Sequence, residues 1–166
     1  MSRAPRVDPA PHLARVAQAL AQPGQPAPLW AALDAALGAV IGHKLFTVLR
    51  FHADSRESER CYTNQPGAYP VGGRKPFTES PWSRQLFGER RPYIGTTAEH
   101  IRSVFFDHAL IISLGCESVL NVPVAFDGRV LGTLNLLHEA GWYGEEDAAP
   151  GLVFAALAAP GYLSLR

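Results

Sequence analysis

Polar side chains interrupt a largely apolar stretch between residues 102 and 118, and four of them define a candidate binding site. These four are Arg102, Asp107, Ser113 and Ser118. A few polar groups in an apolar wall orient a small molecule in a pocket, and a planar guanidinium matches a carboxylate. The stretch therefore predicts a site for a small polar or anionic metabolite. The alternative is an internal Arg102–Asp107 ion pair, with the two serines capping backbone ends.

A fifth polar candidate, Asn121, lies inside an apolar segment. A buried amide has to find hydrogen-bond partners. Those partners are either a ligand or the backbone near Pro123, where a proline interrupts the strand ladder.

Aromatic residues flank a stretch rich in glycine and proline at residues 65–76, which is too irregular for a helix or a long strand. Long loops in compact domains are often functional, so these aromatic residues and a neighbouring asparagine are predicted to close the pocket. The alternative is ordinary packing against the loop backbone. The predicted residues are Tyr62, Asn64, Tyr69 and Trp82, with Phe106 as a further wall.

Catalysis in the same pocket is the competing hypothesis, as a small catabolic enzyme with lyase, hydrolase or redox chemistry. The candidates are Cys116, His108 and Asp107, because a reactive thiolate needs a cationic or basic neighbour. Their spacing defines neither a triad nor a carboxylate pair. The alternative for Cys116 is a small buried side chain.

Metal and cofactor sites have weak support in the sequence. The six histidines include no i,i+4 pair on a predicted helix, and Cys61 and Cys116 form no CxxC motif. No metal site is predicted. Haem ligation by a histidine stays open as an alternative.

The composition excludes several classes of protein. Lys plus Arg and Asp plus Glu both count 15 in 166 residues, so the formal net charge is zero. A nucleic-acid binder carries a basic footprint, and an anionic membrane attracts basic segments, so neither partner is expected. The chain shows no signal-peptide core and no run long enough to span a bilayer. A cytoplasmic protein is expected, and the preference for arginine over lysine favours a bacterial gene.

Hydrophobic periodicity predicts two helices and then a change to strands. The first helix starts at Asp8-Pro9, with Leu13, Val16 and Leu20 on one face, and a second covers 28–40. Strands are expected at 44–52 and 59–64. A short helix follows Ser80-Pro81, a strand covers 92–95, and Thr96 with Glu99 starts another helix.

The strongest local signal is a hairpin. Residues 118–126 and 129–137 are apolar runs separated by Asp127-Gly128, the pattern of a type I′ turn. Simple pairing from this turn places Val124 opposite Leu131, and Asn121 opposite Leu134. A final helix is expected at 150–159, ended by Pro160-Gly161.

The element order and one motif resemble the GAF family. The motif is 118–124 (SVLNVPV), the Asp127-Gly128 turn and 130–136 (VLGTLNL), followed by the acidic start 145–147 of the last helix. The resemblance implies an α/β (α+β) fold with an antiparallel sheet of five or six strands. Terminal helices would cover one face and a ligand pocket would form on the other. Residues 1–26 would be an N-terminal helix and linker, and 27–166 a free-standing GAF-like domain.

The resemblance also bears on ligands and partners. GAF domains bind cyclic nucleotides, haem, bilins, amino acids or aromatic acids, so the fold does not select the ligand. The cysteine pattern does not match the methionine sulfoxide reductases of this fold. A homodimer is expected through the Leu13/Val16/Leu20 stripe and through Val153 and Leu157.

Overall fold

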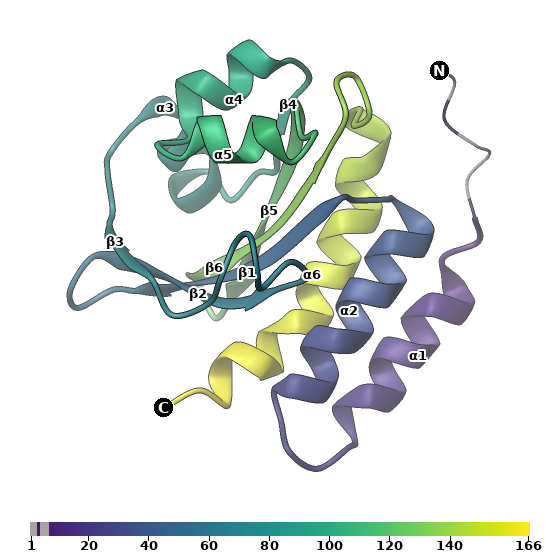
Figure 1. Ribbon diagram of the computed structural model, residues 1–166. Helices are drawn as coiled ribbons and strands as arrows, with labels where there is room; N and C mark the ends of the chain where they lie inside the picture. Colours follow the sequence, from purple (N-terminus) through teal and green to yellow (C-terminus); the bar gives the residue numbers. More distant parts are fainter. Residues whose placement is uncertain (1–2, 4–6) are drawn as a thin grey trace.

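A six-stranded antiparallel sheet forms the middle layer of the molecule (Figure 1). The computed structural model describes residues 3 and 7–166. The strand order is β3-β2-β1-β6-β5-β4, so β1 and β6 lie at the centre. The strands are β1 (Leu45–His52), β2 (Glu57–Thr63), β3 (Arg74–Pro76), β4 (Tyr93–Gly95), β5 (Ser118–Phe126) and β6 (Arg129–His138). Strand β3 forms the end of residues 65–76, the stretch that was expected to be irregular.

Three long helices cover one face of this sheet (Figure 1). They are α1 (Ala10–Leu20), α2 (Ala27–Val40) and α6 (Ala148–Leu163). Leu33 of α2 and Phe154 of α6 pack with Val48 and Leu134 of the central strands, all fully buried. Each such side chain contributes roughly 1.5–3 kcal/mol through its removal from water. This layer holds the main core.

The stripe expected at a dimer interface is used within the chain instead. Val16 is fully buried, and Leu13, Leu20 and Leu157 pack against the main core. Helix α1 is therefore packed into the same core as the rest of the domain. Val153 remains half exposed on α6. The homodimer itself stays a prediction.

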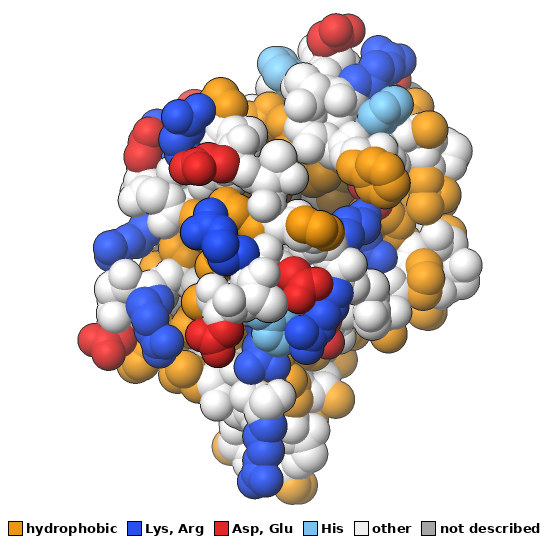
Figure 2. Space-filling model, turned by 90° about the vertical axis from the view of Figure 1, so that its left-hand side faces the viewer, with side chains coloured by type: hydrophobic (Ala, Val, Ile, Leu, Met, Phe, Trp, Pro, Cys, Tyr) orange, Lys and Arg blue, Asp and Glu red, His pale blue; other side chains and the backbone are white. Residues whose placement is uncertain are grey.

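Short helices cover the other face incompletely. They are α3 (Pro81–Ser83), continued by a π-helical turn η1 (Arg84–Gly88), then α4 (Ala98–Val104) and α5 (His108–Ser113). A small second core under them joins Ile101 and Ile111 to Leu45, Val119 and Leu137. Figure 2 looks onto this side and shows a hollow whose visible walls are largely hydrophobic. In the described chain, no helix is both long and apolar enough to cross a membrane.

The β5–β6 hairpin forms around Asp127-Gly128, where both residues have the positive φ angles of a type I′ turn. The expected register beyond the turn is wrong. Leu131 is an extra residue in β6, so Val124 pairs with Gly132 and Asn121 with Asn135. This bulge puts Asn135 on the face of Asn121 and moves the neighbouring leucines of β6 to the helix face.

A second bulge lies at Cys61 in β2. Leu49 pairs with Arg60, but Val48 pairs with Tyr62. Residues two apart in a regular strand face the same side. With Cys61 inserted between them, Arg60 faces the short helices and Tyr62 faces the long ones.

Two helix ends differ from expectation. The cap of α4 is Thr97, whose hydroxyl accepts from the His100 amide, and not Thr96. Helix α6 continues through Pro160 to Leu163, with an additional 3-10 turn η2 (Glu145–Asp147) before it. Tertiary packing explains the continuation, because a Cβ on Gly161 would come within 2.6 Å of the Trp30 ring. Residue 161 therefore packs closely against α2 and remains part of the helix.

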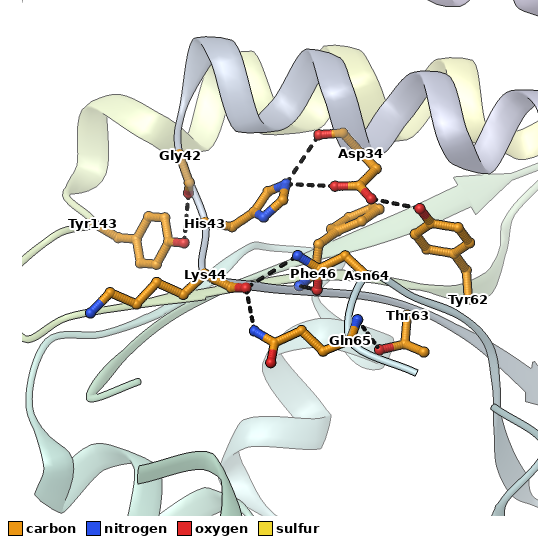
Figure 3. A network of polar contacts seen from close by, with 10 residues as sticks. All are labelled: Asp34, Gly42, His43, Lys44, Phe46, Tyr62, Thr63, Asn64, Gln65 and Tyr143. Atoms are coloured by element: carbon orange, nitrogen blue, oxygen red, sulfur yellow. Dashed lines mark hydrogen bonds and ion pairs between the residues drawn. The ribbon is translucent and has the colours of Figure 1, made fainter. Parts of the chain in front are cut away.

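Tyr62, expected in the pocket, instead joins β2 to helix α2 (Figure 3). Its hydroxyl donates to Asp34 Oδ2 at 2.5 Å, and His43 Nε2 lies 3.0 Å from Asp34 Oδ1. Burial alone would raise the pKa of Asp34. The hydrogen bonds from His43 and Tyr62 outweigh burial and hold this pKa below its usual value of 3.8.

Asn64 also has a structural role, at the start of β1 (Figure 3). Its Oδ1 accepts from the Phe46 amide at 2.8 Å, and its Nδ2 donates to the Lys44 carbonyl at 3.1 Å. Gln65 donates to the same carbonyl. These bonds fix the chain after β2 against β1.

We expect Gly132→Ala to destabilise the fold strongly. A Cβ at this position would overlap the Leu49 carbonyl oxygen and the Tyr162 ring. Overpacking of this kind costs about 3 kcal/mol or more when backbone has to move. Urea unfolding measures the loss. The control is Gly67→Ala, where a Cβ meets nothing within 4 Å; equal effects of the two substitutions would contradict the close packing at Gly132.

We expect Tyr62→Phe to lower the free energy of unfolding by about 1–2 kcal/mol at neutral pH, because a partly buried hydrogen bond to the charged Asp34 carboxylate is lost. The folded pKa of Asp34 is depressed, so its stabilisation is present above pH 3.8 and is lost as pH falls through the folded value. The difference between the two proteins should therefore shrink in acid.

The control for this substitution is Tyr93→Phe. Among the described residues, the Tyr93 hydroxyl has no hydrogen-bond partner, and this side chain is also half-buried. It should leave unfolding nearly unchanged. A difference between wild type and Tyr62→Phe that stays constant down to the acid transition would contradict the role of the Asp34 carboxylate.

Candidate functional site

A cavity of about 670 Å³ lies between the sheet and the layer of short helices. Its floor is formed by β1 and β6, and its walls by the chain from β2 to α3 and by the α4–α5 junction. This volume is within the range of small-molecule pockets. The floor side chains are Thr47, Leu49, Phe51, Thr133 and Asn135.

Aromatic rings form much of the wall. Phe51, Phe77 and Phe87 pack with ring centroids 4.9–5.2 Å apart. Trp82 and Phe105 form an edge-to-face pair at 5.8 Å. Such rings offer a large apolar surface to a bound molecule.

Asp107 gathers the polar groups on one side of the cavity. It accepts a short hydrogen bond from the Tyr69 hydroxyl and another from Lys75 Nζ at 3.3 Å. Arg60 Nη2 lies 3.9 Å from the same carboxylate. Burial, and then the bond to Asp107, raises the pKa of Tyr69, so the phenol stays protonated and donates. Asp107 thereby ties the 69–75 segment to the α4–α5 junction.

Arg60 is held in one orientation. Its guanidinium lies 3.5 Å over the Tyr69 ring, and Nη1 donates to the Pro70 carbonyl at 2.7 Å. Only 12% of the side chain is exposed, and its Nε is buried without a partner among the described residues. A buried cation with unused donors is a strong recognition group for an anion.

A chain of side-chain amides supports the floor. Trp82 Nε1 donates to Asn121 Oδ1 at 3.0 Å, and Asn121 Nδ2 donates to Asn135 Oδ1 at 2.7 Å. Asn135 Nδ2 in turn donates to Thr47 Oγ1 at 3.2 Å. The Asn121 amide therefore finds its partners in neighbouring side chains, and not in backbone at Pro123. Through Trp82 this chain links the floor to the wall.

The structure brings some of the predicted site residues together. Tyr69, Trp82, Phe106 and Asp107 line the cavity, and Asn121 supports it through Trp82. Phe106 is 87% exposed, so it lies at the rim.

The other predicted residues lie elsewhere. Tyr62 and Asn64 have the structural roles described above. Arg102 is exposed, lies 3.7 Å from Glu99 and is outside the cavity lining, so the alternative of an Arg102–Asp107 pair is wrong. Ser113 donates to the Leu110 carbonyl on the surface, and Ser118 to the Glu139 carbonyl.

Sequence reasoning missed Arg60 and Lys75, the two cations beside Asp107. Arg60 was within a predicted strand, but its facing depends on the bulge at Cys61. Lys75 lies at the end of the glycine-rich stretch, and as one of only two lysines it was a signal that could have been used.

The thiol candidate has little thiolate character. Cys116 is fully buried, and burial raises its pKa to about 11. Within the described part of the chain, no hydrogen bond joins Cys116 to His108. Burial also raises the pKa of Cys61 to about 11. At neutral pH both thiols are protonated, and the protonated form is the unreactive one.

Haem ligation by a histidine finds no donor in the described lining of the cavity. This lining contains no histidine, cysteine or methionine, which are common axial ligands of haem. Residues 3 and 7–166 contain no cluster of three or more His, Cys, Asp or Glu side chains able to hold a metal.

Comparison with known proteins gives similarity at the level of structure. No protein-family model matches the sequence, and no curated protein matches it. The GAF domain of an Acinetobacter phosphoenolpyruvate-protein phosphotransferase superposes with a TM-score of 0.74 at 13% identity, over 98% of this chain and 95% of that one.

Two further structures come from proteins of different kinds. Free methionine-R-sulfoxide reductase from Neisseria meningitidis, in complex with its substrate, has a TM-score of 0.69 and 18% identity, over 98% of this chain and 95% of that one. The chromophore-binding domain of a bacteriophytochrome from R. palustris has a TM-score of 0.67 and 10% identity. That match covers 90% of this chain, which spans only 58% of the other.

These likenesses agree with the observed layers: an antiparallel sheet, long terminal helices on one face and a cavity under short helices on the other. The sequence motif in the β5–β6 hairpin points to the same fold. At sequence identities of 10–18%, these similarities support the same fold but do not indicate which ligand is bound. The chain has a GAF-like fold.

Proposed function

We propose that this chain is a binding or sensory module that takes up a small molecule in the cavity over β1 and β6. The observation that carries the proposal is the cavity itself, 670 Å³ in volume and lined by aromatic rings with a few fixed polar groups. This combination is typical of sites for metabolites. Figure 2 shows the surface of this side of the molecule as hollowed.

The fixed polar groups support binding over simple packing. Arg60 is stacked on Tyr69, and Asn135 is held by Asn121 and Thr47. Because their orientation is set before any ligand arrives, little entropy is lost when they bind one. Polar side chains with no ligand to meet would gain more from facing bulk water.

The structural relatives are consistent with such a role. One is a chromophore-binding domain, one a reductase with its substrate, and one part of a methyl-accepting chemotaxis protein, with a TM-score of 0.65. We favour binding over catalysis here because the buried thiols are protonated and the described lining contains no histidine or cysteine. Asp107 is the one carboxylate in the lining formed by the described residues, and its Oδ2 accepts from Tyr69 and Lys75.

A thermal-shift screen of a metabolite library, with Ser103→Phe as counter-screen, tests the proposal. Ser103 lines the cavity from α4 and is exposed, so a phenylalanine there should fill the site without disturbing the core. A ligand at a hundredfold excess over its dissociation constant stabilises the folded state by about 2.7 kcal/mol. Hits should stabilise wild type by this order and Ser103→Phe far less.

The matched control is Ser113→Phe. Both serines are exposed and donate to the carbonyl three residues earlier in a short helix, but Ser113 is outside the lining. Hits should stabilise Ser113→Phe as they do wild type. If every stabilising compound acts equally on all three proteins, or no compound stabilises wild type, the cavity is not the binding site and the proposal fails.

A further inference from the structure

The charges along the cavity lining are unbalanced. Three cationic side chains line it, Arg50, Arg60 and Lys75, against the single carboxylate of Asp107. Arg50 is directed to the carbonyls of Leu165 and Arg166. The cluster at Asp107 thus holds two cations and one anion, which leaves one positive charge.

This positive charge is positioned for recognition. Asp107 Oδ2 already accepts from Tyr69 and Lys75, so a ligand amine could use only the remaining acceptor sites of this carboxylate. A cationic ligand would also meet the Arg60 guanidinium and the Lys75 ammonium. A planar monoanion would complete the charge balance, and the fork of a guanidinium fits a carboxylate.

The apolar part of the cavity lies next to this cluster. Arg60 pairs across the sheet with Leu49, and Phe51 is the next residue of β1 on the same face. The two positions are roughly 7 Å apart along the strand. Phe51 belongs to the group of three phenylalanine rings with Phe77 and Phe87. Charge and aromatic surface are therefore within reach of one small molecule.

We infer that the ligand is an amphipathic monocarboxylate, with its carboxylate at Arg60 and Lys75 and its apolar body against the Phe51, Phe77 and Phe87 rings. The inference rests on the proposed function and names the class of its ligand. One net positive charge suits a monoanion better than a phosphate ester. The aromatic rings exclude a ligand that is polar throughout, because their surface would then stay wet.

Isothermal titration of the full chain with three matched compounds tests this inference. They share a phenyl ring and a three-carbon chain and differ in charge: 3-phenylpropanoate, 3-phenylpropanamide and 3-phenylpropylamine. The carboxylate should bind roughly tenfold more tightly than the amide, as expected for a hydrogen bond to a charged group. The amine should bind most weakly.

The variant that tests the cation is Lys75→Gln. Lys75 is 48% exposed, so its loss should leave the fold intact. It should weaken binding of 3-phenylpropanoate by roughly tenfold and leave the amide unchanged. Arg74→Gln is the matched control, on the same strand and of the same charge but outside this lining. It should change neither.

Three outcomes would overturn the inference: equal binding of carboxylate and amide, tighter binding of the amine, or no binding of any of the three. Retained preference for the carboxylate in Lys75→Gln would also count against Lys75. None of these outcomes contradicts the proposed function. That proposal fails only if the metabolite library gives no ligand whose binding is lost in Ser103→Phe. The two failures are therefore separable.

Discussion

The bulge at Cys61 decides which side chains of β2 reach the cavity. Without the extra residue, Arg60 and Tyr62 would share a face. With it, Arg60 points into the cavity and Tyr62 reaches Asp34 under helix α2. One inserted residue thus affects the packing on both faces of the sheet. It gives the short-helix side a buried cation, and it gives the long-helix side a hydrogen bond that ties the sheet edge to α2.

The Arg60 cation stays in place because its surroundings are fixed from a third element. Asp107, at the α4–α5 junction, accepts from Tyr69, and the Tyr69 ring lies under the guanidinium of Arg60. The removal of these groups from water costs free energy unless they are paired. Here the pairing is between segments far apart in sequence. The same contacts that satisfy the buried charges therefore hold the wall of the cavity to its floor, so shape and charge are set together.

Local signals in the sequence predicted most of the helices and strands. They did not predict which face of the sheet individual residues occupy, because that depends on the register between strands. The Asp127-Gly128 turn and the helix at 28–40 were readable because turn chemistry and periodicity are properties of neighbouring residues. A bulge depends on contacts across the sheet, so the faces of Asn135 and Arg60 could not be read from spacing. The Arg102–Asp107 ion pair, the alternative to ligand binding, rested on nearness in sequence. The actual partners, Lys75 and Arg60, come from a segment more than thirty residues away.

The cavity follows from a mismatch between the two layers that cover the sheet. The long helices α2 and α6 carry apolar faces that pack against β1 and β6 to form the main core. The helices opposite have three to seven residues each and cannot present such a face. The floor between these layers carries the polar side chains of Thr47, Thr133 and Asn135, and hydrogen bonds from neighbouring side chains hold the Asn135 amide in place. The result is a cavity with polar groups on its floor and aromatic rings in its walls, the combination on which the proposed binding of an amphipathic molecule rests.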